Sequence, residues 1–165
     1  MVRLRQLTTL TLCFCLLAGL ASCKTAQKSE DSTDSVATST PDDNTMGDSD
    51  NGKAQGLQTV HFPYDSFVLD SEAKNVMKAN AEIMKAKGNL KVQIEGHCDV
   101  RGGIQYNIAL GEKRANAVKH YMQDLGIAGA RLTTISYGKE RLLDQGNTEA
   151  AHAKNRRANF AITGN

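Results

Sequence analysis

Tryptophan is absent from this chain of 165 residues, and aromatic side chains make up only 5% of it. The hydrophobic core must therefore be built from aliphatic side chains. The chain also lacks a long apolar run: the stretch from Leu7 to Ala21 has roughly 15 residues and contains threonines, whereas a helix needs about 20 to cross a bilayer. With a formal charge of only +2 and basic residues that are scattered, the composition argues against nucleic-acid binding.

The first residues are typical of a bacterial secretory signal peptide, with Arg3 and Arg5 before the apolar stretch and small residues at its end. The string Leu20-Ala21-Ser22-Cys23 resembles the lipobox of bacterial lipoproteins, in which the cysteine is acylated and becomes the mature N-terminus. The resemblance implies that residues 1–22 are removed and that Cys23 carries lipid. A single-pass membrane anchor is the alternative, which the short apolar run disfavours.

Beyond the signal, the chain changes composition at about residue 57. Residues 23–56 contain seven acidic residues against three lysines and almost no large apolar side chains. Such a segment cannot bury enough surface to offset the entropy of ordering it, so we expect a disordered acidic tether. Residues 57–165 form the predicted domain, in which Cys98 is the only cysteine, so no disulfide can form within the mature chain.

Hydrophobic periodicity within the domain predicts two long helices and four strands. Alternation of apolar and polar residues at 90–95 indicates a strand with one solvated face, and Ser71 and Thr148 are candidate helix caps. The order βαβαββ predicts an α+β protein with one layer of helices on one sheet. The predicted elements are strands at 59–62, 90–95, 132–137 and 158–163, helices at 71–88 and 105–125, and one short helical turn after Thr148.

Four ordered motifs in the domain resemble those of the OmpA C-terminal-like domain family. The resemblance covers residues 57–165 and implies a two-layer βαβαββ sandwich whose helices pack on one mixed sheet. It also implies an enzymatically inert domain, without a cofactor, that binds the peptidoglycan stem peptide noncovalently, chiefly through diaminopimelate. The motifs are Glu95-Gly-His-Cys-Asp-Val-Arg-Gly102, Tyr106-Asn107-x-x-Leu110-Gly111-x-x-Arg114-Ala115-x-x-Val118, Ser136-Tyr137-Gly138-Lys139-Glu140 and Asn155-Arg156-Arg157-Ala158.

The resemblance assigns ligand contacts to residues of the loops and of the second long helix. Asp99 matches the acceptor of the diaminopimelate ammonium, and Arg114 matches the partner of its carboxylate, for which a guanidinium offers bidentate geometry. Arg101 and Asp65 match positions on the loop rims, where they contact the ligand or hold Asp99 and Arg114 in place. Helical spacing places Asn107, Leu110 and Arg114 on one face, which can line one pocket.

Several of these residues also have structural interpretations. Asp99 and Arg114 could form an ordinary salt bridge between loop and helix, and Asn107 could hydrogen-bond the loop backbone instead of ligand. Of the adjacent Arg156 and Arg157, one is expected to be solvated and one paired, and at least one to be structural.

A cell-wall enzyme that uses His97, Cys98 and Asp99 is the alternative function. It is disfavoured because adjacent side chains of an extended segment point apart, which separates His97 from Cys98. The histidines also lack zinc-type spacing, so no metal is expected. We expect Cys98 to be a small buried thiol and His97 to hydrogen-bond the backbone.

Together, the lipobox, the tether and the domain predict a lipoprotein of the outer membrane whose domain faces the periplasm and links that membrane to peptidoglycan. Lys24 follows the lipidated cysteine, where an aspartate would resemble an inner-membrane retention signal. Lipoproteins of this family also partner with the Tol system, notably TolB, in envelope integrity and cell division. The resemblance therefore makes TolB and other Tol proteins candidate partners.

Overall fold

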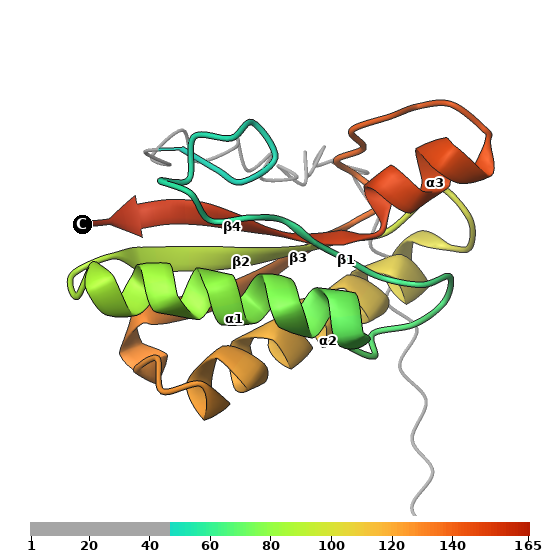
Figure 1. Ribbon diagram of the computed structural model, residues 1–165. Coiled ribbons are helices and arrows are strands. Elements are labelled where there is room, and N and C mark those ends of the chain that lie inside the picture. The colour runs from blue at the N-terminus through green and yellow to red at the C-terminus, as the bar shows by residue number, and fades with distance from the viewer. Residues whose placement is uncertain (1–46) are drawn as a thin grey trace, which may run out of the picture. The chain divides into compact units, whose positions relative to one another are not determined.

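Four strands pair into one mixed sheet in the spatial order β1-β4-β2-β3 (Figure 1). The computed structural model describes residues 47–165, so the predicted signal peptide, Cys23 and the tether up to residue 46 lie outside the described residues. β2 runs parallel to β3, and β4 runs antiparallel to both β1 and β2. The strands are β1 (Val60–His61), β2 (Lys91–His97), β3 (Leu132–Gly138) and β4 (Arg157–Gly164).

The two long helices, α1 (Ser71–Ala86) and α2 (Ile104–Asp124), cover the same face of the sheet (Figure 1). A short 3-10 helix, η1 (Gly129–Arg131), leads into β3, and α3 (Glu149–Asn155) leads into β4. The predicted α+β sandwich, with helices packed on one mixed sheet, is confirmed. Within the described part of the chain, no helix is long and apolar enough to cross a membrane.

The core between sheet and helices is aliphatic and rich in methionine, as the lack of tryptophan requires. Apolar residues at helical spacing in α1 and α2 meet alternating residues of the strands, so each element buries one face. Phe62 and Phe160 are the aromatic side chains in this core. The larger buried side chains include Met77, Met84, Leu90, Val92, Ile94, Val118, Met122, Leu132 and Ile162.

The start of α1 differs from the prediction by one residue. Asp70, and not Ser71, is the N-cap, and its carboxylate accepts a hydrogen bond of 2.8 Å from the backbone N–H of Ala73. The predicted cap of α3 is confirmed, since the Thr148 hydroxyl accepts from the backbone N–H of Ala151 at 3.2 Å. Aspartate and serine are both good caps, so the sequence alone could not choose between neighbours.

The prediction that the disordered tether extends to residue 56 is wrong for residues 47–56. The carbonyl of Gly47 accepts from the N–H of Ile162 at 2.8 Å, Asp48 forms a β-bridge with Ala161, and Ala54 is fully buried. The composition of this segment is that of a disordered chain, but its hydrogen-bond partners are supplied by β4, more than a hundred residues later. Local composition carries no information about partners so distant in the sequence.

The same segment explains why the predicted solvated face of β2 is partly covered. Glu95 is only 7% exposed, and its carboxylate accepts a hydrogen bond of 2.9 Å from the side-chain amide of Asn159. The carbonyl oxygen of that amide in turn accepts from the backbone N–H and the hydroxyl of Ser49. Residues 47–56 thus seal part of the sheet face opposite to the long helices.

Candidate functional site

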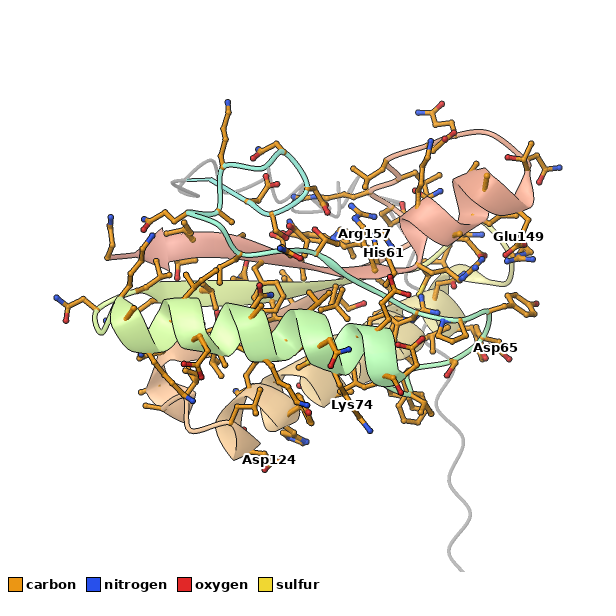
Figure 2. The ribbon with its side chains drawn as sticks, in the orientation of Figure 1. His61, Asp65, Lys74, Asp124, Glu149 and Arg157 are labelled. Atoms are coloured by element: carbon orange, nitrogen blue, oxygen red, sulfur yellow. The ribbon has the colours of Figure 1, made fainter. Side chains whose placement is uncertain are left out.

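A cavity of about 270 Å³ opens where β2 ends and α2 begins. Figure 2 shows Asp65 and Glu149 at this end of the domain, whereas Asp124, the last residue of α2, lies toward the other end. All six predicted ligand-binding residues line the cavity: Asp65, Asp99, Arg101, Asn107, Leu110 and Arg114. Tyr64, Cys98, Gly102, Tyr106 and Arg156 complete the lining.

Arg114 lines the cavity and is fully buried. Its Nε donates to the carbonyl of Ser66 at 2.8 Å, and its two terminal nitrogens donate to the carbonyls of His97 at 2.7 Å and Pro63 at 3.3 Å. Burial lowers the pKa of Arg114, yet a guanidinium remains charged at neutral pH. Among residues 47–165 no carboxylate lies within ion-pair distance of it, so the expected alternative of an Asp99–Arg114 salt bridge is absent there.

Asp99 is 4% exposed and is held by two other arginines. Its Oδ2 accepts from Nε of Arg101 at 3.2 Å and from a terminal nitrogen of Arg156 at 3.4 Å, and its Oδ1 accepts from the backbone N–H of Arg101 at 3.0 Å. Burial raises the pKa of Asp99, but the hydrogen bonds from Arg101 and Arg156 outweigh that effect and leave the pKa below its usual range. Asp99 is therefore an anion, and its Oδ1 keeps acceptor capacity.

Glu149 at the start of α3 links the two arginines that hold Asp99. Its carboxylate lies 2.8 Å from a terminal nitrogen of Arg156 and 3.4 Å from one of Arg101. Arg156 also donates through Nε to the carbonyl of Phe62 at 3.0 Å. This network fixes the orientation of Asp99 from the loop, from the residue before β4 and from α3.

Two tyrosines form the rim of the cavity. Tyr64 is 60% exposed, and the guanidinium of Arg101 lies over its ring at 4.0 Å from the centroid. The hydroxyl of Tyr106 donates to Asp65, and this hydrogen bond raises the pKa of Tyr106 above its ordinary value. Asp65 has a φ of 50°, a left-handed conformation that aspartate tolerates in turns. Asp65 and Arg101 thus occupy the loop rims, as the resemblance implied.

The face of α2 that was predicted from spacing does line the cavity. Asn107, Leu110 and Arg114 are all buried on this face. Asn107 donates through Nδ2 to the carbonyls of Arg101 at 2.8 Å and Gly103 at 3.1 Å. The side chain of Asn107 therefore fixes the loop that carries Asp99, which is the structural role that the sequence left open.

His97 and Cys98 are not arranged as a catalytic pair. Burial raises the pKa of the Cys98 thiol, which donates to the carbonyl of Asn107 at 3.3 Å. The expectation that His97 hydrogen-bonds the backbone is wrong: its ring is 1% exposed, and within residues 47–165 neither ring nitrogen has a hydrogen-bond partner. Glu95 lies 3.7 Å from Nε2, which is beyond hydrogen-bond range.

Of the charged residues that line the cavity, Arg156 is the one that the sequence did not assign to the ligand site. The expectation that one of Arg156 and Arg157 is solvated is also wrong, because both are buried and paired. Arg157 forms an ion pair with Asp50 at 2.8 Å. The motif Asn-Arg-Arg was the available signal, but it did not show which partner each arginine has.

Comparison with known proteins gives a consistent result. The family model of the OmpA family matches residues 61–156. The peptidoglycan-associated lipoprotein of Pasteurella multocida is 35% identical over 158 residues, which cover 96% of this chain and 99% of that protein. The peptidoglycan-associated lipoprotein of Haemophilus influenzae is 42% identical over 107 residues, 65% of this chain and 70% of that protein.

A solved structure agrees with these sequence relatives. The crystal structure of the peptidoglycan-associated lipoprotein from Burkholderia pseudomallei has a TM-score of 0.63 and 33% identity, over 68% of this chain and 96% of that chain. The relatives carry the name of a lipoprotein and not of an enzyme, so the prediction of a non-enzymatic protein is confirmed. Because the family model spans more than half of the sequence and the Pasteurella relative nearly all of it, the chain belongs to the OmpA family, together with the peptidoglycan-associated lipoproteins that it resembles.

Proposed function

We propose that this protein is an envelope anchor whose domain binds peptidoglycan noncovalently in the cavity between β2 and α2. The ligand is the stem peptide, held by the ammonium and carboxylate at the free end of diaminopimelate. The names of the relatives support peptidoglycan as the partner. The charges of the cavity, three arginines and two aspartates among its lining residues, support a ligand that carries both signs.

The observation that carries this proposal is the buried, unpaired charge of Arg114. A buried cation without a counter-ion is costly, and three carbonyl contacts satisfy only three of its five N–H donors. One N–H on each terminal nitrogen remains for a ligand carboxylate, which a guanidinium can bind in bidentate fashion. The carboxylate of a bound ligand would thus be the counter-ion of Arg114.

Asp99 is suited to the other end of the same ligand. Its carboxylate is ionised and oriented by Arg101 and Arg156, while Oδ1 accepts one backbone hydrogen bond and can accept a ligand ammonium as well. Asp65 and the rim tyrosines line the same cavity and would contact the rest of the peptide. Recognition of an ammonium and a carboxylate on one carbon requires an anion and a cation close together, and one cavity lined by both Asp99 and Arg114 meets that requirement.

The remainder of the anchor follows from the N-terminal sequence. Lipid on Cys23 would hold the chain in the outer membrane, with the domain facing the periplasm and residues 24–46 as the tether. Tethering keeps many domains near the wall at high effective concentration, so weak individual contacts add up to a firm attachment. TolB and other Tol proteins are the further partners that this role in envelope integrity and division suggests.

The test is a pulldown of the full chain, purified in detergent, with purified peptidoglycan sacculi. Arg114→Lys keeps the charge but removes the bidentate fork, and Asp99→Asn removes the anion at nearly constant size. We expect each change to weaken binding at least about tenfold, the usual worth of a hydrogen bond to a charged group. Binding that is unchanged in both variants would refute the clamp.

Matched controls separate lost binding from lost folding. Arg131 donates to the carbonyls of Met84, Lys87 and Leu90, as Arg114 does to three others, but it lies outside the cavity. Asp144 accepts a hydrogen bond from the backbone N–H of Gly146, two residues later, and pairs with Lys154. Asp99 likewise accepts from the backbone N–H two residues later and pairs with a basic side chain, in both cases that of Arg101. Arg131→Lys and Asp144→Asn should keep binding, and thermal unfolding followed by circular dichroism shows whether the two cavity variants remain folded at the temperature of the pulldown.

A further inference from the structure

The segment that joins the tether to the domain runs along β4 before the first strand begins. We call residues 47–59 the N-terminal strap. The carbonyl of Gly47 accepts from Ile162, the N–H of Ser49 donates to the carbonyl of Phe160 at 3.0 Å, and the hydroxyl of Ser49 accepts from the N–H of Phe160 at 3.0 Å. The strap thus continues the two-residue pairing of β1 along the free edge of β4 as far as Ile162.

Side chains lock the strap to the strand. The amide oxygen of Asn159 accepts three hydrogen bonds from the strap, from the Ser49 N–H at 3.0 Å, the Ser49 hydroxyl at 2.7 Å and the Asp50 N–H at 3.1 Å. The carboxylate of Asp50 pairs with Nε of Arg157 at 2.8 Å and accepts from the hydroxyl of Thr59 at 2.9 Å. Figure 2 shows Arg157 on the side of β4 that faces the strap.

The strap begins at the end of β4 that is remote from the cavity. Gly47 lies opposite Ile162, whereas Arg156, just before β4, lines the cavity. Six residues separate them along an extended chain, which corresponds to roughly 20 Å. Figure 1 shows the strap over β4 and the beginning of α2 beyond the far end of the strand.

We propose that the strap is a mechanical clasp that receives the pull of the lipid tether at one end of the sheet while peptidoglycan is held at the other. This inference rests on the proposed function of the protein as an anchor. Hydrogen bonds of an antiparallel pair are perpendicular to the strands, so tension along the strands loads them together, in shear, instead of one at a time. The hydrogen bonds of Ser49 and Asp50 to the side chain of Asn159 are loaded by the same tension.

The clasp also keeps tension away from the binding residues. β1 leads directly into the loop whose carbonyls, those of Pro63 and Ser66, accept hydrogen bonds from Arg114. β1 pairs with β4 through only two residues, Val60 and His61. Without the strap, a pull on the tether would pass through this short pairing into the wall of the cavity and displace the partners of Arg114.

Single-molecule force spectroscopy on the full chain tests the clasp in two pulling geometries. One handle is a tag at the N-terminus, and the other is attached either at the cavity rim, through Gly103→Cys, or after Asn165. A side chain at Gly103 meets nothing within 4 Å, and Cys98 is buried. Cys13, Cys15 and Cys23 are changed to serine.

We expect the strap to be released at a clearly higher force when the chain is pulled from the cavity rim than when it is pulled from Asn165. The second geometry peels Gly47 from Ile162 one bond at a time. Ser49→Ala and Asp50→Asn should each speed release about tenfold at constant force in the rim geometry. Asp144→Asn, which makes the same chemical change at an ion pair outside the strap, should leave the rate unchanged.

Equal release forces in the two geometries, or release rates that Ser49→Ala and Asp50→Asn do not change, would overturn the clasp. No peptidoglycan is present in this experiment. The force measurement therefore tests the clasp even if the protein does not bind sacculi. Conversely, a negative result of the force measurement does not count against peptidoglycan binding.

Discussion

Replacing Gly96 by alanine should disrupt both the fold and the binding site, because β2 and α2 touch backbone to backbone at this residue. A Cβ at Gly96 would lie 1.9 Å from the carbonyl oxygen of Gly111 and 2.6 Å from its carbonyl carbon. Gly111 is likewise close to Gly96, since a Cβ at Gly111 would lie 2.8 Å from the carbonyl oxygen of Gly96. No side-chain rotation can relieve an overlap between backbone atoms, so the helix itself would have to move.

The size of the effect follows from that displacement. Restoring an ordinary contact requires a separation of more than 3 Å, so α2 has to move by over 1 Å relative to β2. Overpacking in a core usually costs about 1–3 kcal/mol, and an overlap with backbone belongs at the upper end, at about 3 kcal/mol or more. Arg114 lies one turn after Gly111, and a shift of this size breaks its hydrogen bonds of 2.7–2.8 Å.

Urea unfolding followed by circular dichroism measures the loss of stability, and the sacculus pulldown measures the loss of binding. Gly88→Ala is the control, because a Cβ there meets nothing within 4 Å and the φ of Gly88 is not in the left-handed region. We expect the control to be neutral or to stabilise by about 0.4–1 kcal/mol through the unfolded state. Gly96→Ala with the stability and binding of the parent would refute the close approach of the two backbones.

Two further predictions concern the residues beside the cavity. Burial lowers the pKa of His97 from its ordinary 6.5, against the effect of Glu95, so below about pH 6.5 the unfolded chain takes up a proton that the folded chain resists. The free energy of unfolding should therefore decrease as the pH is lowered, by up to about 1.4 kcal/mol per pH unit. In His97→Asn the urea midpoint should depend less on pH between 7.5 and 5.5 than in the parent. The same dependence of the midpoint on pH in both proteins would contradict this prediction. Cys98, buried and with a raised pKa, should react with Ellman's reagent only as fast as the domain opens, and Cys98→Ala should still bind sacculi; rapid labelling or lost binding would count against a purely structural thiol.

The elements that the sequence predicted correctly are those whose signal is local. The apolar positions of α2 recur at helical spacing, and the placement of Asn107, Leu110 and Arg114 on one face follows from that period alone. The cavity could be anticipated for the same reason, with motif resemblance adding the loop residues. For the face of α2 the information lies within about twenty consecutive residues, whereas Asp65 and the other loop residues were found only through the motif resemblance.

The predictions that failed depend on partners far along the chain. Residues 47–56 are polar and acidic, and contacts with distant parts of the chain, chiefly the edge of β4, make them ordered. Glu95 alternates with apolar residues like a solvated position, yet Asn159 and the strap cover it. His97 was expected to find a backbone partner, but it is packed against the ring of Tyr137 at 5.5 Å between centroids. Periodicity describes which face a residue occupies and not what covers that face.

The adjacent arginines connect the two ends of the proposed anchor. Successive side chains of an extended chain point to opposite sides, so Arg156 and Arg157 cannot share a partner. Arg156 reaches Asp99 and Glu149 at the cavity, and Arg157 reaches Asp50 of the strap. On a strand with one solvated face, one of two adjacent arginines would normally point into water. Both are buried here because each has an acidic partner, Glu149 of α3 for Arg156 and Asp50 of the strap for Arg157. The same dipeptide thus orients the anion that we propose binds peptidoglycan and secures the segment through which the tether would pull.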